Sequence, residues 1–173
     1  MEIKLFGSGI IIFASVLTGM ILVNKNKQRE SSLSMFILFI KYIKNEISYS
    51  RRTLSEITKT FAADKKSKKN KFLQQLEFNC NSQTLSPYSI SAINALNNTK
   101  KSLSLSETDL ALLSNFFNDV GKGDAESQLA LCSHYLTLLD EALTDAKSTA
   151  VKKNKMTTQV SFLSGLFIVI LLI

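Results

Sequence analysis

Apolar residues fill both ends of the chain and leave the charged residues between them. Residues 5–23 and residues 156–173 contain no Asp, Glu, Lys or Arg. A helix needs about 20 mostly apolar residues to cross a bilayer, so the pattern predicts one transmembrane helix at residues 3–23 and another at residues 156–173. Residues 24–155 between them are long enough for one compact domain.

An apolar heptad repeat runs through residues 33–61, and neither Gly nor Pro interrupts it. This spacing places an apolar stripe along one face of a helix. It predicts a single long helix that packs against another helix. The stripe consists of Leu33, Ile40, Ile47, Leu54 and Phe61 at one heptad position and Phe36, Ile43, Ser50 and Ile57 at the other.

A second stripe, with spacings of three and four, lies between residues 129 and 150. Gly121 and Gly123 interrupt the helical pattern before this stripe, and Asp124 stands where a helix cap is expected. Because no Gly or Pro follows until Gly165, the pattern predicts a helix that continues directly into the C-terminal apolar segment. The stripe consists of Leu129, Cys132, Leu136, Leu139, Leu143, Ala146 and Ala150.

Shorter helices are predicted between these two long ones. Asp64 precedes a basic run and can cap a helix whose apolar positions lie between residues 72 and 76. A loop is expected at residues 79–86. Ser86 followed by Pro87 is typical of a helix start, with a cap and then a first-turn proline.

The helix that starts at Pro87 is expected to end at the polar residues 97–101. Ser104 and Glu107 then have the spacing of a capping box, in which two side chains satisfy backbone N–H groups at a helix start. That box predicts one more helix before the glycine break. No alternation typical of strands occurs at any length.

The fold predicted from these patterns is all-α. We expect a membrane-anchored helical bundle built on two long antiparallel helices that are continuous with the terminal transmembrane segments. The two helices must be antiparallel because both meet the bilayer from the same side, and their apolar stripes favour packing against each other.

The basic residues determine the expected orientation. The net charge of +7 belongs to the central domain, because Glu2 and Lys4 cancel each other. Lys and Arg near membrane helices stay in the cytoplasm, so we expect a cytoplasmic central domain and both termini outside the cytoplasm. The basic residues expected to face lipid headgroups are Lys25, Lys27, Arg29, Lys65, Lys66, Lys68, Lys69, Lys152, Lys153 and Lys155.

No constellation of residues indicates catalysis. The chain lacks a glycine-rich phosphate loop and an HExxH motif, Cys80 and Cys132 are far apart, and His134 is the only histidine. We therefore expect neither an enzyme nor a bound cofactor or metal. The excess of Lys and Arg over Asp and Glu suggests one alternative function, a membrane-tethered domain that binds nucleic acid or anionic lipid.

Three segments carry a resemblance to a known family. The first is residues 45–56, which contain Asn-Glu-Ile-Ser-Tyr-Ser and then Thr-Leu-Ser-Glu. The second consists of Leu105, Asp109 and residues 120–128. The third is residues 163–166, just before the aliphatic end. In order and spacing they resemble the stage III sporulation protein AB family over essentially the whole chain. The chain departs from that family at Thr53, where a proline is usual.

The resemblance implies a function that composition alone does not. The family is similar to the inner-membrane platform proteins of type II secretion and type IV pilus systems, which bind a secretion-type ATPase. It implies a multi-pass protein on the mother-cell side of the outer forespore membrane, in a channel complex with the ATPase, stage III sporulation protein AA. No nucleic acid partner is expected, and a homo-oligomer stays open. The candidate partner-binding residues are Glu46, Tyr49, Glu56, Asp109, Gly121, Asp124 and Gln128.

Overall fold

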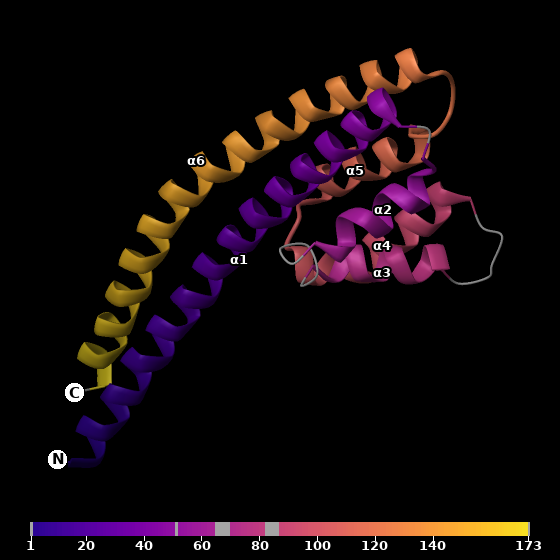
Figure 1. Cartoon of the computed structure of the whole chain (residues 1–173). Helices are drawn as coiled ribbons and strands as arrows, with labels where there is room; N and C mark the ends of the chain where they lie inside the picture. Colours follow the sequence, from indigo (N-terminus) through magenta and orange to yellow (C-terminus); the bar gives the residue numbers. More distant parts are fainter. Residues whose placement is uncertain (1, 51, 65–69, 82–86, 173) are drawn as a thin grey trace. The chain divides into compact units, whose positions relative to one another are not determined.

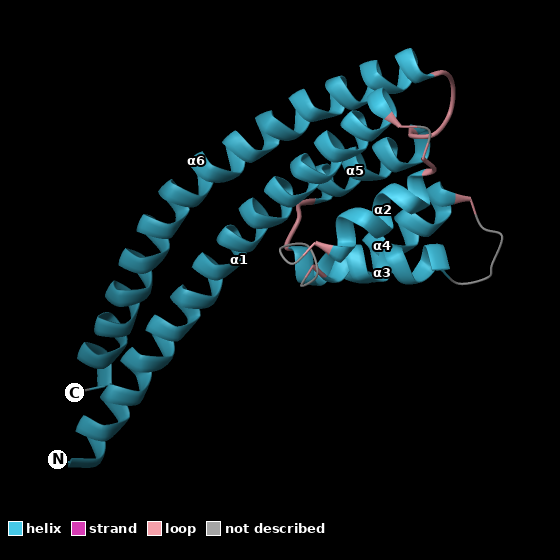
Figure 2. Ribbon diagram, viewed as in Figure 1, coloured by secondary structure: helices cyan, strands magenta, loops and turns pink. Residues whose placement is uncertain are grey.

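The computed structural model describes residues 2–50, 52–64, 70–81 and 87–172. The chain divides into two compact units, Met1–Glu30 with Thr144–Ile173, and Ser31–Leu143. The described residues form six α-helices and no strand (Figure 2). The predicted all-α class is therefore confirmed.

Two long helices begin and end the chain. Helix α1 spans Glu2–Tyr49 and helix α6 spans Ala125–Leu172, and each has 48 residues (Figure 1). Neither is interrupted, so the prediction of a last helix continuous with the C-terminal apolar segment is confirmed. The helices between them are α2 (Leu54–Ala63), α3 (Lys71–Asn81), α4 (Tyr88–Leu103) and α5 (Glu107–Asp119).

The unit formed by the chain ends contains the first part of α1 and the last part of α6. Arg29 Nη1 lies 3.7 Å from Asp145 Oδ2, which joins the two helices by a partly exposed ion pair. Among the residues whose side chains are described, no helix is both long enough and apolar enough to cross a membrane. The predicted transmembrane helices, residues 3–23 and 156–173, consist almost entirely of residues whose side chains lie outside that description.

The second unit is a bundle whose core is made by aromatic rings from four helices. Phe36 of α1 and Phe117 of α5 lie with ring centroids 6.4 Å apart. Phe72 of α3 packs on Phe36 at 4.8 Å, and Tyr135 of α6 packs on Phe116 of α5 at 5.4 Å. Within this unit α1 and α5 form a middle layer, with α6 on one side and α2, α3 and α4 on the other (Figure 1).

Residues of both predicted apolar stripes are buried inside this bundle. Leu33, Phe36, Ile40 and Ile43 of α1 are fully buried, and so are Cys132 and Leu139 of α6. Burial of each large apolar side chain contributes about 1.5–3 kcal/mol to folding. Burial also raises the pKa of the Cys132 thiol to about 11, while the nearby charge of Lys44 opposes the rise. Helices α1 and α6 are thus neighbours in this unit.

The single helix predicted for residues 33–61 is wrong, because α1 ends at Tyr49 and α2 starts at Leu54. The Ser50 hydroxyl lies 2.9 Å from the carbonyl oxygen of Glu46, at the last turn of α1. The Ser50 N–H keeps the helical hydrogen bond to the same carbonyl at 2.7 Å, so α1 ends with its last backbone bond formed. The heptad spacing persists across the break, so the periodicity does not reveal it.

The predicted cap at Asp64 is also wrong. Asp64 follows the end of α2, whereas Asn70 caps α3. The Asn70 side-chain oxygen accepts hydrogen bonds from the backbone N–H groups of Phe72 at 3.0 Å and Leu73 at 3.2 Å. The buried positions Phe72, Leu73 and Leu76 are as predicted.

Helix α4 is longer than predicted. It starts at Tyr88 with Pro87 as its N-cap, one residue later than predicted, since Pro87 was expected in the first turn; Ser86 lies outside the described residues. It continues through residues 97–101 to Leu103 rather than ending there. Thr99 is buried on this stretch, and its hydroxyl donates to the Ala95 carbonyl at 2.7 Å, which keeps a polar side chain satisfied inside the helix.

The capping box before α5 uses other residues than predicted. Ser106 and Asp109 form it: the Asp109 N–H donates to Ser106 Oγ at 3.1 Å, and the Ser106 N–H donates to Asp109 Oδ2 at 2.9 Å. Ser104 instead ends α4 with a positive φ of 54°. Ser104 and Glu107 are three residues apart, as are Ser106 and Asp109, so the spacing fits either pair. The position of the backbone turn decides which pair forms the box.

Candidate functional site

Two chain connections meet at one end of the bundle unit. The first joins α1 to α2, and the second joins α5 to α6. Leu54, the first residue of α2, lies against Gly121 of the second connection, since a Cβ added to Gly121 would be 2.9 Å from Leu54 Cδ1. We call residues 46–50, 52–56 and 120–128 the corner. Six of the seven predicted partner-binding residues lie in it.

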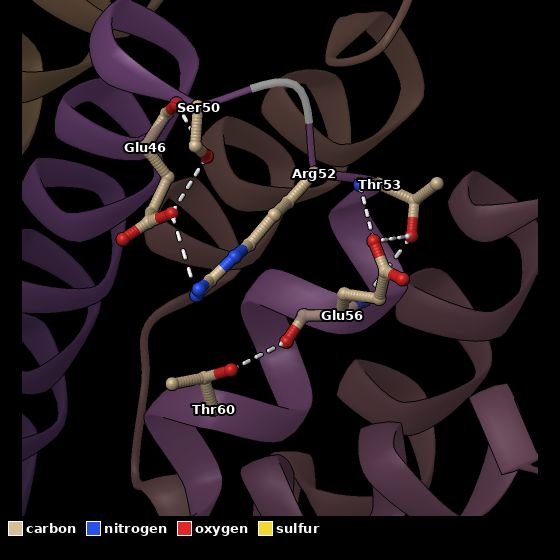
Figure 3. A network of polar contacts seen from close by, with 6 residues as sticks. All are labelled: Glu46, Ser50, Arg52, Thr53, Glu56 and Thr60. Carbon is tan, nitrogen blue, oxygen red and sulfur yellow. Dashed lines mark hydrogen bonds and ion pairs between the residues drawn. The ribbon is translucent and has the colours of Figure 1, made fainter.

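A carboxylate organises the α1–α2 side of the corner (Figure 3). Glu46 Oε2 lies 2.7 Å from the Ser50 hydroxyl, which donates to it, and 3.8 Å from Arg52 Nη1. Arg52 was not among the sequence candidates. Only the turn of the chain at Ser50 brings its guanidinium back to the last turn of α1.

A capping box starts α2 on the same side. The Glu56 N–H donates to Thr53 Oγ1 at 3.3 Å, and the Thr53 N–H donates to Glu56 Oε2 at 2.9 Å. The hydrogen bond from the Thr53 backbone, followed by that from its hydroxyl, lowers the pKa of the Glu56 carboxyl. Glu56 is thereby held in one orientation (Figure 3), and its lowered pKa keeps it charged at neutral pH.

Tyr49 is the most accessible large side chain of the corner. It ends α1 and is 91% exposed, compared with 61% for Leu38 earlier on the same helix. Tyrosine combines a large apolar ring with a hydroxyl, and exposed tyrosines are enriched at protein interfaces. The structure therefore presents Tyr49 to solvent beside an ordered group of polar side chains.

A buried glutamine holds the α5–α6 side of the corner. Gln128 is only 6% exposed. Its Oε1 accepts a hydrogen bond from the Gly121 N–H at 2.8 Å, and its Nε2 donates to the Lys122 carbonyl. Gly121 and Gly123 have φ values of 87° and 99°, which suit glycine. Gln128, a predicted partner-binding residue, thus has a role in holding the turn.

Asp124 caps α6 as the sequence predicts. Its Oδ1 accepts a hydrogen bond from the Ser127 N–H at 3.3 Å, and the side chain is exposed. The hydroxyl and the backbone N–H of Ser127 lower the pKa of the Asp124 carboxyl. The carboxylate is therefore the form that stabilises the start of α6.

We expect Asp124→Ala to lower the melting temperature modestly at pH 7. Because the pKa of Asp124 is lowered in the folded state, its contribution is complete above the unfolded-state pKa, about 3.9, and is lost as the pH falls through the folded value. The difference from wild type should shrink towards pH 3 in thermal melts followed by circular dichroism. Glu141→Gln, which removes an exposed carboxylate far from the first turn of α6, is the control. An Asp124→Ala protein that keeps full stability but loses sporulation would instead identify a partner contact.

Asp109 lies away from the corner. It is at the opposite end of α5 from Val120, it is 2% exposed, and its carboxylate is part of the Ser106 capping box. The structure therefore does not bring it together with the other six candidates.

The predicted lipid-facing basic residues are only partly described. Lys25, Lys27 and Lys152 are exposed, and Arg29 is half-buried beside Asp145. Residues 65–69, which contain four of these lysines, lie outside the described residues. So do the side chains of Lys153 and Lys155.

The remaining reactive side chains do not assemble into a site. Burial raises the pKa of the half-buried Cys80 thiol, so the thiol is protonated at neutral pH. His134 is exposed, as a lone surface histidine is expected to be. Within the described residues, no group of three or more His, Cys, Asp or Glu side chains could hold a metal ion.

The fold and the corner define an all-helical protein whose bundle is joined by two uninterrupted helices to both ends of the chain. The chain belongs to the stage III sporulation protein AB family, whose model matches residues 4–173. Family membership gives it a role in sporulation. No curated protein matches the chain significantly, and neither does any solved structure.

Proposed function

We propose that this protein is a non-enzymatic platform component of a channel between mother cell and forespore. It couples a cytoplasmic secretion-type ATPase to membrane components. The observation that carries the proposal is the continuity of α1 and α6: each helix runs without a loop from a terminal apolar segment into the bundle. A partner that binds the bundle is thus connected to the terminal segments through helical backbone alone.

The terminal apolar segments are proposed to anchor the protein in the membrane on the mother-cell side of the outer forespore membrane. Lys25, Lys27 and Lys152 lie on the bundle side of these segments and are exposed. The positive-inside rule then assigns the bundle to the cytoplasm and both termini to the other side. A cytoplasm-active reporter fused to the C-terminus should be inactive, and strong activity there would contradict this orientation.

The corner is the proposed ATPase-binding surface. Its polar side chains are already held by neighbours, Glu46 by Ser50 and Glu56 by Thr53. Side chains that are ordered before binding lose less conformational entropy when a partner docks. Exposed Tyr49 adds the aromatic anchor that commonly dominates the binding energy of an interface.

We expect Tyr49→Ala to weaken capture of stage III sporulation protein AA by the full chain about thirtyfold, which corresponds to a hot-spot residue. The measurement is a titrated pull-down with the full chain in mild detergent. Leu38→Ala is the matched control, because it also removes an exposed apolar side chain from α1. Equal binding by both variants would show that the corner is not the docking surface.

The net charge of +7 favours a second candidate, a tethered domain that binds nucleic acid or anionic lipid. The two candidates differ in their response to salt. Binding of duplex DNA at physiological ionic strength, with a steep loss of affinity as salt rises, would favour the alternative. The platform function requires instead that the purified chain neither hydrolyses ATP nor retains DNA.

A further inference from the structure

Lysines and aliphatic side chains are exposed close together on both helices of the unit formed by the chain ends, which we call the terminal unit. On α1, Ile21 is exposed one turn before exposed Lys25. On α6, Val151 is exposed one turn after Lys147 and directly before Lys152, and both lysines are exposed. Residues one turn apart share a helix face, so each helix carries lysine and aliphatic side chains on the same face.

The ion pair between Arg29 and Asp145 gives the register of the two helices in this unit. The helices run in opposite directions, so residues before Arg29 lie beside residues after Asp145. At 1.5 Å per residue, Lys27 and Lys147 each lie about 3 Å from the pair towards the chain ends, and Lys25 lies about 6 Å from it. The lysines of α1 and α6 are therefore at similar heights.

The exposed aliphatic residues also begin at similar heights on the two helices. Ile21 lies about 12 Å from the ion pair along α1, and Val151 lies about 9 Å from it along α6. Val160 and Leu163, still farther along α6, are exposed as well. A band of lysines thus borders an exposed aliphatic surface on both helices.

No acidic residue accompanies the lysines of this band, since residues 21–28 and 146–152 contain no Asp or Glu. Arg29, which the sequence predicted to face lipid headgroups, differs from these lysines. Its guanidinium is paired with Asp145, and its side chain is 20% exposed. The positive charge that the band presents to an anionic ligand therefore comes from lysines.

We propose that four exposed lysines of the terminal unit form a collar that binds the headgroups of anionic phospholipids. The collar consists of Lys25, Lys27, Lys147 and Lys152. A lysine can place its ammonium group against a lipid phosphate while its hydrocarbon stem stays beside apolar surface. The inference rests on the membrane anchoring proposed above and adds the lipid class and the residues that select it, but it involves neither the corner nor an ATPase.

The exposed aliphatic residues favour a phospholipid over a nucleic acid as the ligand of the collar. The phosphates of either could neutralise the lysines. A nucleic acid would leave Ile21 and Val151 in water, whereas a phospholipid bilayer removes these side chains from water by contact with its acyl chains. Only the phospholipid therefore satisfies both kinds of side chain.

The first measurement locates the bilayer boundary on α6. The chain contains no Trp, so the fluorescence of Val151→Trp reports on that position alone. In the full chain reconstituted into vesicles of phosphatidylcholine and phosphatidylglycerol, lipid with brominated acyl chains should quench Val151→Trp more strongly than aqueous iodide does. Leu38→Trp, at an exposed position of the bundle unit, is the control and should show the reverse. Quenching of both mainly by iodide would overturn the membrane anchoring and the collar together.

The second measurement tests the lysines by titrating phosphatidylglycerol onto the full chain in neutral detergent, with bound lipid detected by native mass spectrometry. One basic residue near an anionic surface contributes about fivefold in affinity, so Lys147→Gln with Lys152→Gln should weaken binding about twenty-five-fold. Lys100→Gln with Lys101→Gln removes the same charge from exposed positions of the bundle unit and should bind as wild type does. Lys147→Arg with Lys152→Arg keeps the charge and should also bind as wild type does.

Lys25→Gln with Lys27→Gln repeats the test on the other helix and should weaken binding to a similar degree. Several outcomes would overturn the collar and leave the anchoring intact. Equal weakening by the glutamine pairs of the terminal unit and of the bundle unit would show an effect of net charge alone. Equal affinity of wild type for phosphatidylcholine and phosphatidylglycerol would show that anionic headgroups are not selected. Retention of a short DNA duplex in preference to phosphatidylglycerol would assign the lysines to nucleic acid.

Discussion

Gly121→Ala should lower the melting temperature of the protein by about 10 °C, since a destabilisation of 1 kcal/mol shifts a small domain by about 4–8 °C. Two effects add at this position. A side chain at a φ of 87° costs about 1–2 kcal/mol. In addition, the new Cβ would lie 2.9 Å from Leu54 Cδ1, so the end of the Leu54 side chain must move away from the turn.

Gly123→Ala is the matched control for Gly121→Ala. Its φ of 99° imposes a comparable backbone strain, but the nearest atom to an added Cβ is 3.8 Å away, which is ordinary contact. The difference between the two melting temperatures therefore reports the contact with Leu54. Leu54→Ala in the Gly121→Ala background should recover part of the loss. Equal decreases in melting temperature for both glycine variants would show that the contact between Gly121 and Leu54 does not affect stability.

Gln128→Leu should also destabilise the protein, by about 1–3 kcal/mol. Leucine fills a similar volume but leaves the Gly121 N–H and the Lys122 carbonyl without the partners that Gln128 supplies. Both hydrogen bonds are part-buried, and a typical hydrogen bond contributes about 0.5–1.5 kcal/mol to stability. Urea unfolding at neutral pH, followed by circular dichroism, measures the change.

Gln128→Glu separates the hydrogen bonds from the shape of the side chain. The carboxylate can still accept from Gly121 but cannot donate to Lys122, and burial disfavours its charge. The protonated acid can do both. Since the pKa of this Glu is raised in the folded state, the variant should be closest to wild type near pH 4 and lose stability as the pH rises. A Gln128→Glu protein as stable as wild type at pH 8 would show that the Lys122 bond contributes nothing.

The corner is where prediction from sequence was least complete. Residues 45–56 and 120–128 stood out in the sequence, but nothing there indicated that they meet. The contact between Gly121 and Leu54 joins residues 67 positions apart. Glu46 and Arg52 lie close in sequence, yet they pair only because the helix predicted to continue to residue 61 ends at Tyr49.

The sequence by itself determined the features that depend on local order. Helical periodicity located Phe36 and Leu139 in the core, the absence of Gly and Pro between Asp124 and Gly165 indicated that the last helix continues into the apolar segment, and two glycines marked the turn before it. These features follow from spacings of three, four and seven residues along the chain. They need no knowledge of which distant segments meet.

Tertiary structure alone decided the rest. It buried Gln128 on the inner side of its turn and chose Ser106 over Ser104 as the cap of α5. Each of these outcomes depends on contacts between helices or on where one backbone turn falls. Two residue patterns with the same local spacing can therefore lead to different structures, and only packing selects between them.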